Sequence, residues 1–188
     1  MKLLLTVFLC FGLQTFIYAQ NIEVCGDCTV KSISEAIEIA SPNTIITVKE
    51  GVYYEHEIIV NKPVTIVGEK GSVINGEKEG STIRVHSDDV TIKNLTIENV
   101  GFSHTEEFAA IHVQKSKRFN ITDNNFRKVF FGILIEASKN GEIKDNVILG
   151  DSATEFYSGN GVHAWKSEGL FISYIKTKIF NLFRICEQ

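Results

Sequence analysis

The sequence predicts an all-β protein whose main part is a parallel β-helix. Three observations predict this fold: short strand-forming runs, a repeat whose insertions always fall at the same corner, and almost no helical periodicity. The runs are rich in Ile, Val and Thr and are separated by Gly, Asn, Asp, Ser and Lys, as strands and turns require. Of the 188 residues, 44% are hydrophobic and 22% are charged, proportions that exclude wholesale disorder.

The first element in the chain, residues 1–19, is predicted to be a secretory signal peptide. A short positive start, Met1-Lys2, precedes an almost wholly apolar run from Leu3 to Tyr18, and Ala19 offers a small residue at the cleavage position. The alternative is a membrane anchor, but the run is shorter than the roughly 20 apolar residues that a span needs. We therefore expect an exported mature chain that starts at Gln20 and carries no transmembrane span.

Two cysteines follow closely, in the pattern Cys25-Gly-Asp-Cys28. In an oxidising export compartment this spacing favours a small-loop disulfide. A thiolate pair that binds a metal is the next interpretation. A thioredoxin-type redox site is a third, but no βαβ pattern surrounds the motif.

One short helix is predicted next, from about Ser34 to Ala40, as a cap on the N-terminal end of the β-helix. Ser32 and Glu35 have the spacing of a capping box. The apolar residues that follow recur at helical spacing, and Pro42 ends the segment: Ile33, Ala36, Ile37 and Ala40.

The central part of the chain repeats. Ile111, Ile133 and Val162 are each followed ten residues later by another Ile, at positions 121, 143 and 172. With Ile92 added, the isoleucines at 92, 121, 143 and 172 are separated by 29, 22 and 29 residues. The seven additional residues of each longer interval lie at the same point of the repeat. A constant core with insertions at one corner is typical of a solenoid.

Short strands and a coil near 22 residues make this solenoid a parallel β-helix, which we assign to residues 20–173. Each strand should pair with its equivalent in the next coil, about 4.8 Å away, and the inward Ile, Val and Phe side chains should stack. Asn124 and Asn146 occupy equivalent positions and are predicted to form a structural amide ladder at a turn. An antiparallel sandwich is the alternative, but it would not explain the equal spacings.

The motifs, taken in order, resemble the NosD family of nitrous oxide reductase maturation proteins. The resemblance covers about residues 29–173 and rests on three segments: Ile46–Tyr53, Lys62–Glu69 and Gly159–Ser167. It implies a right-handed β-helix of the pectin-lyase type and a periplasmic location. It also implies a role with ABC transporter subunits and the maturation machinery of nitrous oxide reductase, with copper as the metal handled.

Metal delivery would require ligands, and histidines are the first candidates. His112 and His163 are predicted to point outward from the same face, with Leu134 between them. The two coils that separate them span about 9–10 Å, which is too far for both imidazoles to bind one ion directly. The inserted loops add His104 and Glu106, so we expect weak Cu(II) or Zn(II) binding; the alternative is solvated loop charge around two surface histidines.

Two rival functions follow from the fold class. Polysaccharide lysis or hydrolysis needs converging carboxyl groups, but Asp88-Asp89 has the sequence of a turn, and no carboxylate cluster is predicted beside Arg84, Arg118 or Arg127. A non-catalytic carbohydrate-binding role is the other rival, with aromatic residues such as Trp165 available to stack on sugars. The formal net charge of −4 argues against nucleic-acid binding. We expect no enzymatic activity.

The last segment, residues 174–188, loses the Gly, Asn and Asp punctuation of the coils. One interpretation is a helical cap, because a helical stripe fits five residues: Ile175, Ile179, Phe180, Phe183 and Cys186. The favoured interpretation is unrelated sequence left by a frameshift or a premature stop. An uncapped last coil would expose a strand edge, so self-association is expected.

Overall fold

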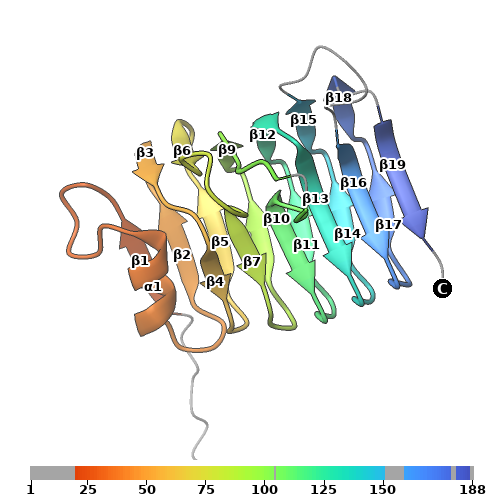
Figure 1. Ribbon diagram of the computed structural model, residues 1–188. Helices are drawn as coiled ribbons and strands as arrows, with labels where there is room; N and C mark the ends of the chain where they lie inside the picture. Colours follow the sequence, from red (N-terminus) through yellow and green to blue (C-terminus); the bar gives the residue numbers. More distant parts are fainter. Residues whose placement is uncertain (1–19, 104, 151–158, 179–180, 187–188) are drawn as a thin grey trace, which may run out of the picture.

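The computed structural model describes residues 20–103, 105–150, 159–178 and 181–186, and these residues form a parallel β-helix (Figure 1). Successive coils of the chain stack on one another, so that three sheets of parallel strands run along the stack. The predicted fold class is confirmed, and the antiparallel alternative is wrong because every strand pair in the three sheets is parallel.

Each sheet takes one strand from each coil. In spatial order, the first sheet contains seven strands: β1 (Asn21–Val24), β2 (Ile45–Val48), β5 (Thr65–Gly68), β8 (Thr91–Lys93), β11 (Asn120–Thr122), β14 (Glu142–Lys144) and β17 (Phe171–Ser173). The second contains six: β3 (Gly51–Tyr54), β6 (Ser72–Asn75), β9 (Thr96–Glu98), β12 (Asn125–Val129), β15 (Val147–Gly150) and β18 (Lys176–Lys178). The third also contains six: β4 (Ile58–Val60), β7 (Ile83–Val85), β10 (Ala109–Gln114), β13 (Phe131–Glu136), β16 (Asn160–Trp165) and β19 (Asn181–Cys186).

The register of the sheets matches the repeat in the sequence. In the first sheet Ile121 lies between Ile92 and Ile143. In the third sheet Ile133 lies between Ile111 and Val162. These side chains are at most 1% exposed, so the positions that repeat in the sequence form the continuous apolar core.

The two equivalent asparagines are buried at the turn between the first and second sheets. Asn124 Nδ2 donates to Asn146 Oδ1 at 3.1 Å, and the backbone N–H of Asn124 donates to the same oxygen at 3.0 Å. One coil earlier, the Leu95 N–H donates to Asn124 Oδ1 at 3.1 Å. The amides therefore link consecutive coils and satisfy backbone groups that the turn leaves unpaired.

The single helix of the described residues, α1 (Ile33–Ile39), covers the N-terminal end of the stack. Ser32 caps it by accepting from the Glu35 N–H at 3.1 Å. Glu35 does not return the bond to Ser32 as a capping box would, but accepts from the Lys31 N–H at 3.2 Å. The helix is also tied to the first coil, because Glu55 accepts from the Ile33 N–H at 2.7 Å and Lys62 Nζ donates to the Ile37 carbonyl at 2.9 Å.

The C-terminal segment continues the sheets. Strand β18 pairs with β15, so that Thr177 takes the position next to Ile148, and β19 pairs with β16. The interpretation of this segment as a helical cap is therefore wrong for the residues that the structure describes. The alternation in Lys176-Thr177-Lys178, exposed, half-buried and exposed, is the two-residue period of a strand.

Residues 1–19, the predicted signal peptide, lie outside the described residues. In the rest of the chain, as far as it is described, no helix has the length and apolar character needed to cross a membrane.

Candidate functional site

The outer surface of the third sheet carries the candidate site. One residue beyond each core position, the strands place a row of side chains on the outside: Ile59, Arg84, His112, Leu134, His163 and Arg184, in spatial order. Leu134 lies between the two histidines, and the histidines share one face, as the repeat predicted. They are not solvated surface residues, however, because His112 is 6% exposed and His163 is 8% exposed.

His112 is buried by a chain of charged partners. Arg84 Nη1 lies 2.9 Å from His112 Nδ1, and the same guanidinium binds both carboxylate oxygens of Glu57. On the other side, Glu136 Oε2 lies 3.5 Å from His112 Nε2. Glu136 in turn accepts from Gln114 Nε2 at 2.7 Å. Three strands, β7, β10 and β13, and the segment before β4 therefore contribute to one network.

This network fixes the protonation of the imidazole. Because Arg84 can only donate, His112 Nδ1 must accept, and the ring proton is assigned to Nε2, facing Glu136. Burial, and then the charge of Arg84, lower the pKa of His112 to about 4, against the opposing effect of Glu136. His112 is thus neutral near pH 7. Burial would raise the pKa of Glu57, but hydrogen bonds from Arg84 and from the Ser81 N–H outweigh burial and lower it.

A pH dependence of stability follows from this buried neutral imidazole. Because the pKa of His112 falls from 6.5 to about 4 on folding, the unfolded chain takes up a proton first as the pH falls. The free energy of unfolding should therefore decrease between about pH 6.5 and pH 4, by at most about 3 kcal/mol from this group. In urea unfolding at pH 7 and pH 4.5, His112→Gln should show a smaller acid-induced loss than the wild type. Equal losses in both proteins would contradict this assignment.

His163 is covered by apolar and aromatic neighbours. The Phe131 ring lies 5.7 Å from the imidazole, centroid to centroid, and Phe130 packs edge-on against Phe131 at 4.8 Å. Burial lowers the pKa of His163, while Glu107, whose Oε1 lies 3.9 Å from Nδ1, opposes that shift. Phe131 and Leu134 belong to a small apolar cluster separate from the main core. Sequence reasoning missed this cluster on the outside of the third sheet.

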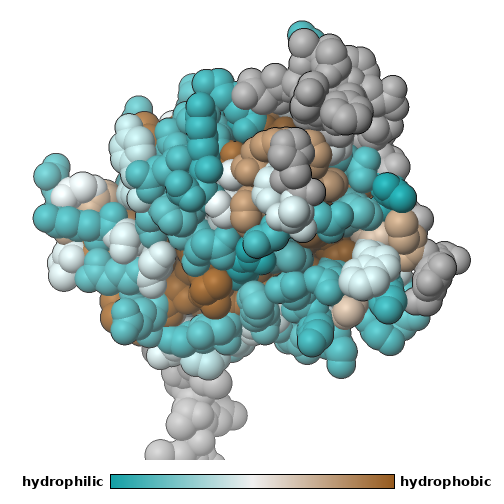
Figure 2. Space-filling view, viewed as in Figure 1, coloured by the Kyte–Doolittle hydropathy of each residue, from teal (hydrophilic) through white to brown (hydrophobic). Residues whose placement is uncertain are grey.

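An open cleft of about 330 Å³ adjoins the His112 network. It combines carboxylates with one exposed ring, since Trp165 is 41% exposed at its rim and Lys166 Nζ lies 4.6 Å from the ring centroid. Its lining is Arg84, Glu106, Glu107, Phe108, His112, Leu134, Glu136 and Trp165. The space-filling view shows that the face seen there is largely hydrophilic, with apolar side chains exposed only in patches (Figure 2).

The predicted histidine metal site is only partly assembled. Glu106 and His112 line the same cleft. His163 does not line it but contacts Glu107, which does, and His104 lies outside the described residues. His112 does not fit a metal ion, because Arg84 occupies Nδ1 and Nε2 holds the proton. In the part of the chain that is described, no three His, Cys, Asp or Glu side chains are grouped closely enough to hold a metal.

The carboxylates considered for sugar cleavage have a structural role in a turn. Arg118 donates to both oxygens of Asp89 at 2.6 and 2.7 Å, and Asp88 Oδ1 accepts from the Lys117 N–H at 2.8 Å. The hydrogen bond from Arg118 lowers the pKa of Asp89, which is the opposite of what a general acid needs. The turn interpretation of Asp88-Asp89 agrees with this arrangement, in which each aspartate binds the next coil.

Cys25 and Cys28 form a disulfide with a Cα–Cα distance of 5.0 Å. They lie in the loop between β1 and α1, at the opposite end of the stack from Cys186 in β19 (Figure 1).

Comparison with known proteins identifies the family. The model of the family described as "Periplasmic copper-binding protein (NosD)" matches residues 38–178, most of the chain. The chain belongs to the NosD family. It is 29% identical over 114 residues to the "Probable ABC transporter binding protein NosD" of Pseudomonas aeruginosa, covering 60% of this chain and 27% of that protein. The protein of that name from Stutzerimonas stutzeri is 25% identical over 118 residues, or 62% of this chain and 27% of its own length. The chain thus matches about a quarter of the length of these NosD proteins.

Solved structures support the fold of this NosD family member. A Parabacteroides merdae protein described as a "putative glycosyl hydrolase" superposes with a TM-score of 0.72 at 12% identity, covering 88% of this chain and 89% of that one. A pectin methylesterase in complex with a hexasaccharide gives a TM-score of 0.52 at 17% identity, covering 83% and 67%. At these identities the likeness concerns the β-helix fold alone.

Proposed function

We propose that this protein is an exported accessory factor for the maturation of nitrous oxide reductase, which assists copper-site assembly together with an ABC transporter. The observation that carries the proposal is the match of residues 38–178 to a family described as periplasmic and copper-binding. The names of the two NosD relatives, as ABC transporter binding proteins, support the proposed partner. Copper is here a cargo that is passed on, so the lack of fit at His112 is compatible with the role.

The internal contacts of the groups considered for sugar cleavage favour binding over catalysis. Arg84 is held by Glu57 and His112, and the aspartates considered for hydrolysis are held by Arg118 and by backbone N–H groups. These groups are committed to contacts within the protein, whereas a glycosidase of the common type needs a proton donor and a second carboxylate across the scissile bond.

A deletion strain tests the proposed role. In a host that produces nitrous oxide reductase, deletion of this gene should leave the reductase exported but deficient in copper, and expression of the full chain should restore the copper. Metal analysis of the purified reductase provides the measurement. An unchanged copper content would contradict the proposal. Release of reducing ends or unsaturated uronates from polysaccharides by the pure protein would instead establish the enzymatic alternative.

A further inference from the structure

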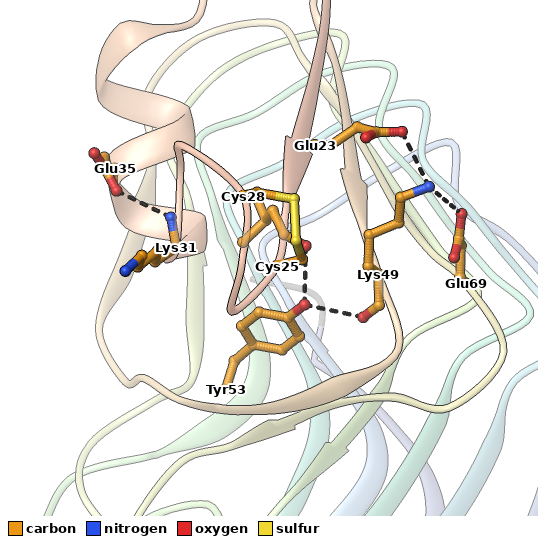
Figure 3. The surroundings of a disulfide bond; sticks show 9 residues. Glu23, Cys25, Cys28, Lys31, Glu35, Lys49, Tyr53 and Glu69 are labelled. Carbon is orange, nitrogen blue, oxygen red and sulfur yellow. Dashed lines mark hydrogen bonds and ion pairs between the residues drawn. A yellow bond between two sulfur atoms is a disulfide. The ribbon is translucent and has the colours of Figure 1, made fainter.

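The disulfide loop is the most chemically distinctive feature outside the cleft. It follows β1 at the N-terminal end of the stack and contains both Cys25 and Cys28 (Figure 3). Sulfur donors are otherwise scarce in the described residues, because Cys186 is the other cysteine among them and the single Met of the sequence is Met1. In the described part of the chain, Cys25 and Cys28 are therefore the candidate ligands for a soft metal ion.

The loop keeps its shape through bonds that do not depend on the disulfide. The Cys25 N–H donates to the Val30 carbonyl at 3.2 Å, and the Cys28 N–H donates to the Cys25 carbonyl at 3.2 Å. Val24 and Val30, which form a parallel bridge across the base of the loop, are 0% and 8% exposed in the core. Breaking the sulfur–sulfur bond would therefore leave the two thiols close together.

Tyr53 fixes the base of the same loop from below. Its hydroxyl lies 2.9 Å from the Val24 carbonyl and 3.0 Å from the Lys49 carbonyl (Figure 3). The ring itself is 7% exposed. A buried tyrosine in β3 thus holds together the ends of β1 and β2, from which the cysteine loop emerges.

The loop that carries the two cysteines borders solvent. Both cysteines are half-buried, while Gly26 and Asp27 between them are exposed. No heavy atom lies within 4 Å of the position that a Cβ would take on Gly26. An open cleft of about 440 Å³, lined in part by Gly26, Tyr53 and Glu55, adjoins the loop. The segment between the two cysteines is therefore open on the side of this cleft.

We infer that Cys25 and Cys28 form a redox-gated Cu(I) site, closed as the disulfide and open as the dithiol. Two thiolates on a preformed loop are soft ligands, which select Cu(I) over hard cations. This inference rests on the proposed copper role, and it names the ion and its ligands. The metal-thiolate interpretation and the disulfide interpretation of the motif then describe two states of one site.

The chemistry of opening and loading balances with a dithiol as the reductant. One thiolate of the reductant attacks a sulfur of the disulfide and forms a mixed disulfide, and its second thiol releases the protein. Two electrons and two protons pass to Cys25 and Cys28, and the reductant leaves as its own disulfide. Cu(I) then replaces the two thiol protons and forms two copper–sulfur bonds. Reoxidation of the pair by a disulfide acceptor would release the ion.

Chelator competition tests the site directly. The full chain, recovered from the export compartment and reduced anaerobically with a phosphine, is mixed with Cu(I) held by the chromophoric ligand bicinchoninate. The reduced protein should withdraw about one Cu(I) per chain, whereas the oxidised protein should leave the chelator spectrum unchanged. X-ray absorption at the copper edge should show sulfur neighbours.

Variants separate this site from other ligands. Cys25→Ser and Cys28→Ser should each abolish the withdrawal of copper, and Cys186→Ser, the matched control at the other end of the stack, should retain it. Circular dichroism checks that each variant is folded. Equal copper uptake by the reduced wild type and the Cys25→Ser variant would overturn the inference, as would loss of uptake in Cys186→Ser.

The chelator competition and the deletion strain can fail independently of each other. If the double variant with both cysteines changed to Ser restores the copper of the reductase, the accessory role does not use this pair, although the binding measured in vitro still decides whether the site exists. If the chelator test succeeds and the deletion strain has normal reductase copper, the Cu(I) site stands and the maturation role fails.

Discussion

Replacing Ile133 by Asp should reduce the free energy of unfolding by about 4 kcal/mol or more. Ile133 is 0% exposed and pairs with Ile111 on one side and Val162 on the other. The substitution removes a large apolar side chain from the middle of the stack and buries a carboxylate with no partner. Urea unfolding followed by circular dichroism measures the loss.

Thr122→Asp provides the matched control. Thr122 is half-buried, one residue from the core Ile121, and its neighbours on the adjoining strands are Lys93 and Lys144. A carboxylate between two lysines should be tolerated within about 0.5 kcal/mol. If Ile133→Asp does not fold, Ile133→Ala keeps the test quantitative, with an expected loss of about 2–4 kcal/mol. Equal tolerance of the two aspartates would show that the register is wrong.

The core could be predicted because its apolar positions recur in every coil. Every coil must place an apolar side chain at the same angle, so Ile92, Ile121 and Ile143 recur at intervals that the sequence displays directly. The asparagine ladder could be predicted for the same reason. Equivalent positions in a β-helix are neighbours in space, and a repeated polar residue at a buried turn has its own copy as a partner.

The environment of the site could not be predicted in the same way. The sequence placed His112 on the outer surface, but its burial depends on Glu57, Arg84 and Glu136, which belong to three other coils or loops. One signal was available: Arg84 lies one residue beyond the core Ile83, so the register alone places it beside His112. Phe131 covers His163 through irregular packing on the outside of the β-helix, and the sequence repeat does not predict that packing.

The helical-cap interpretation of the C-terminal segment was wrong because the apolar residues there fit two periods. Ile175, Ile179 and Phe183 are spaced by four, which favours a helix, whereas Lys176-Thr177-Lys178 alternates as a strand does. Pairing decides between them, since the edge of β15 offers unpaired backbone groups to the next coil. Thr177 accordingly lies beside Ile148, in a position where the earlier coils have Phe126 and Ile97.

Asn146→Leu should cost about 2–4 kcal/mol of unfolding free energy although leucine is apolar and of similar size. Asn146 is 0% exposed, and its side chain makes four hydrogen bonds. Oδ1 accepts from the backbone N–H and from Nδ2 of Asn124, at 3.0 and 3.1 Å. Nδ2 donates to the carbonyls of Ile121 and Lys144, at 2.7 and 3.0 Å. Leucine would leave these partners buried and unpaired.

Asn120→Leu is the matched control, because the same chemical change is made on the outside of the stack. Asn120 is half-buried and makes one long side-chain contact, from Nδ2 to Thr91 Oγ1 at 3.5 Å. Its substitution should change the free energy of unfolding by about 0.5 kcal/mol or less.

Asn146→Asp provides a second test of the ladder. The aspartate keeps the shape of the side chain and the oxygen that accepts from Asn124, but it places an ionised oxygen opposite the carbonyls of Ile121 and Lys144. That variant should regain stability relative to the wild type as the pH falls and the buried carboxyl is protonated. Equal unfolding midpoints for Asn146→Leu and Asn120→Leu would show that the amide ladder contributes nothing to the stacking of coils.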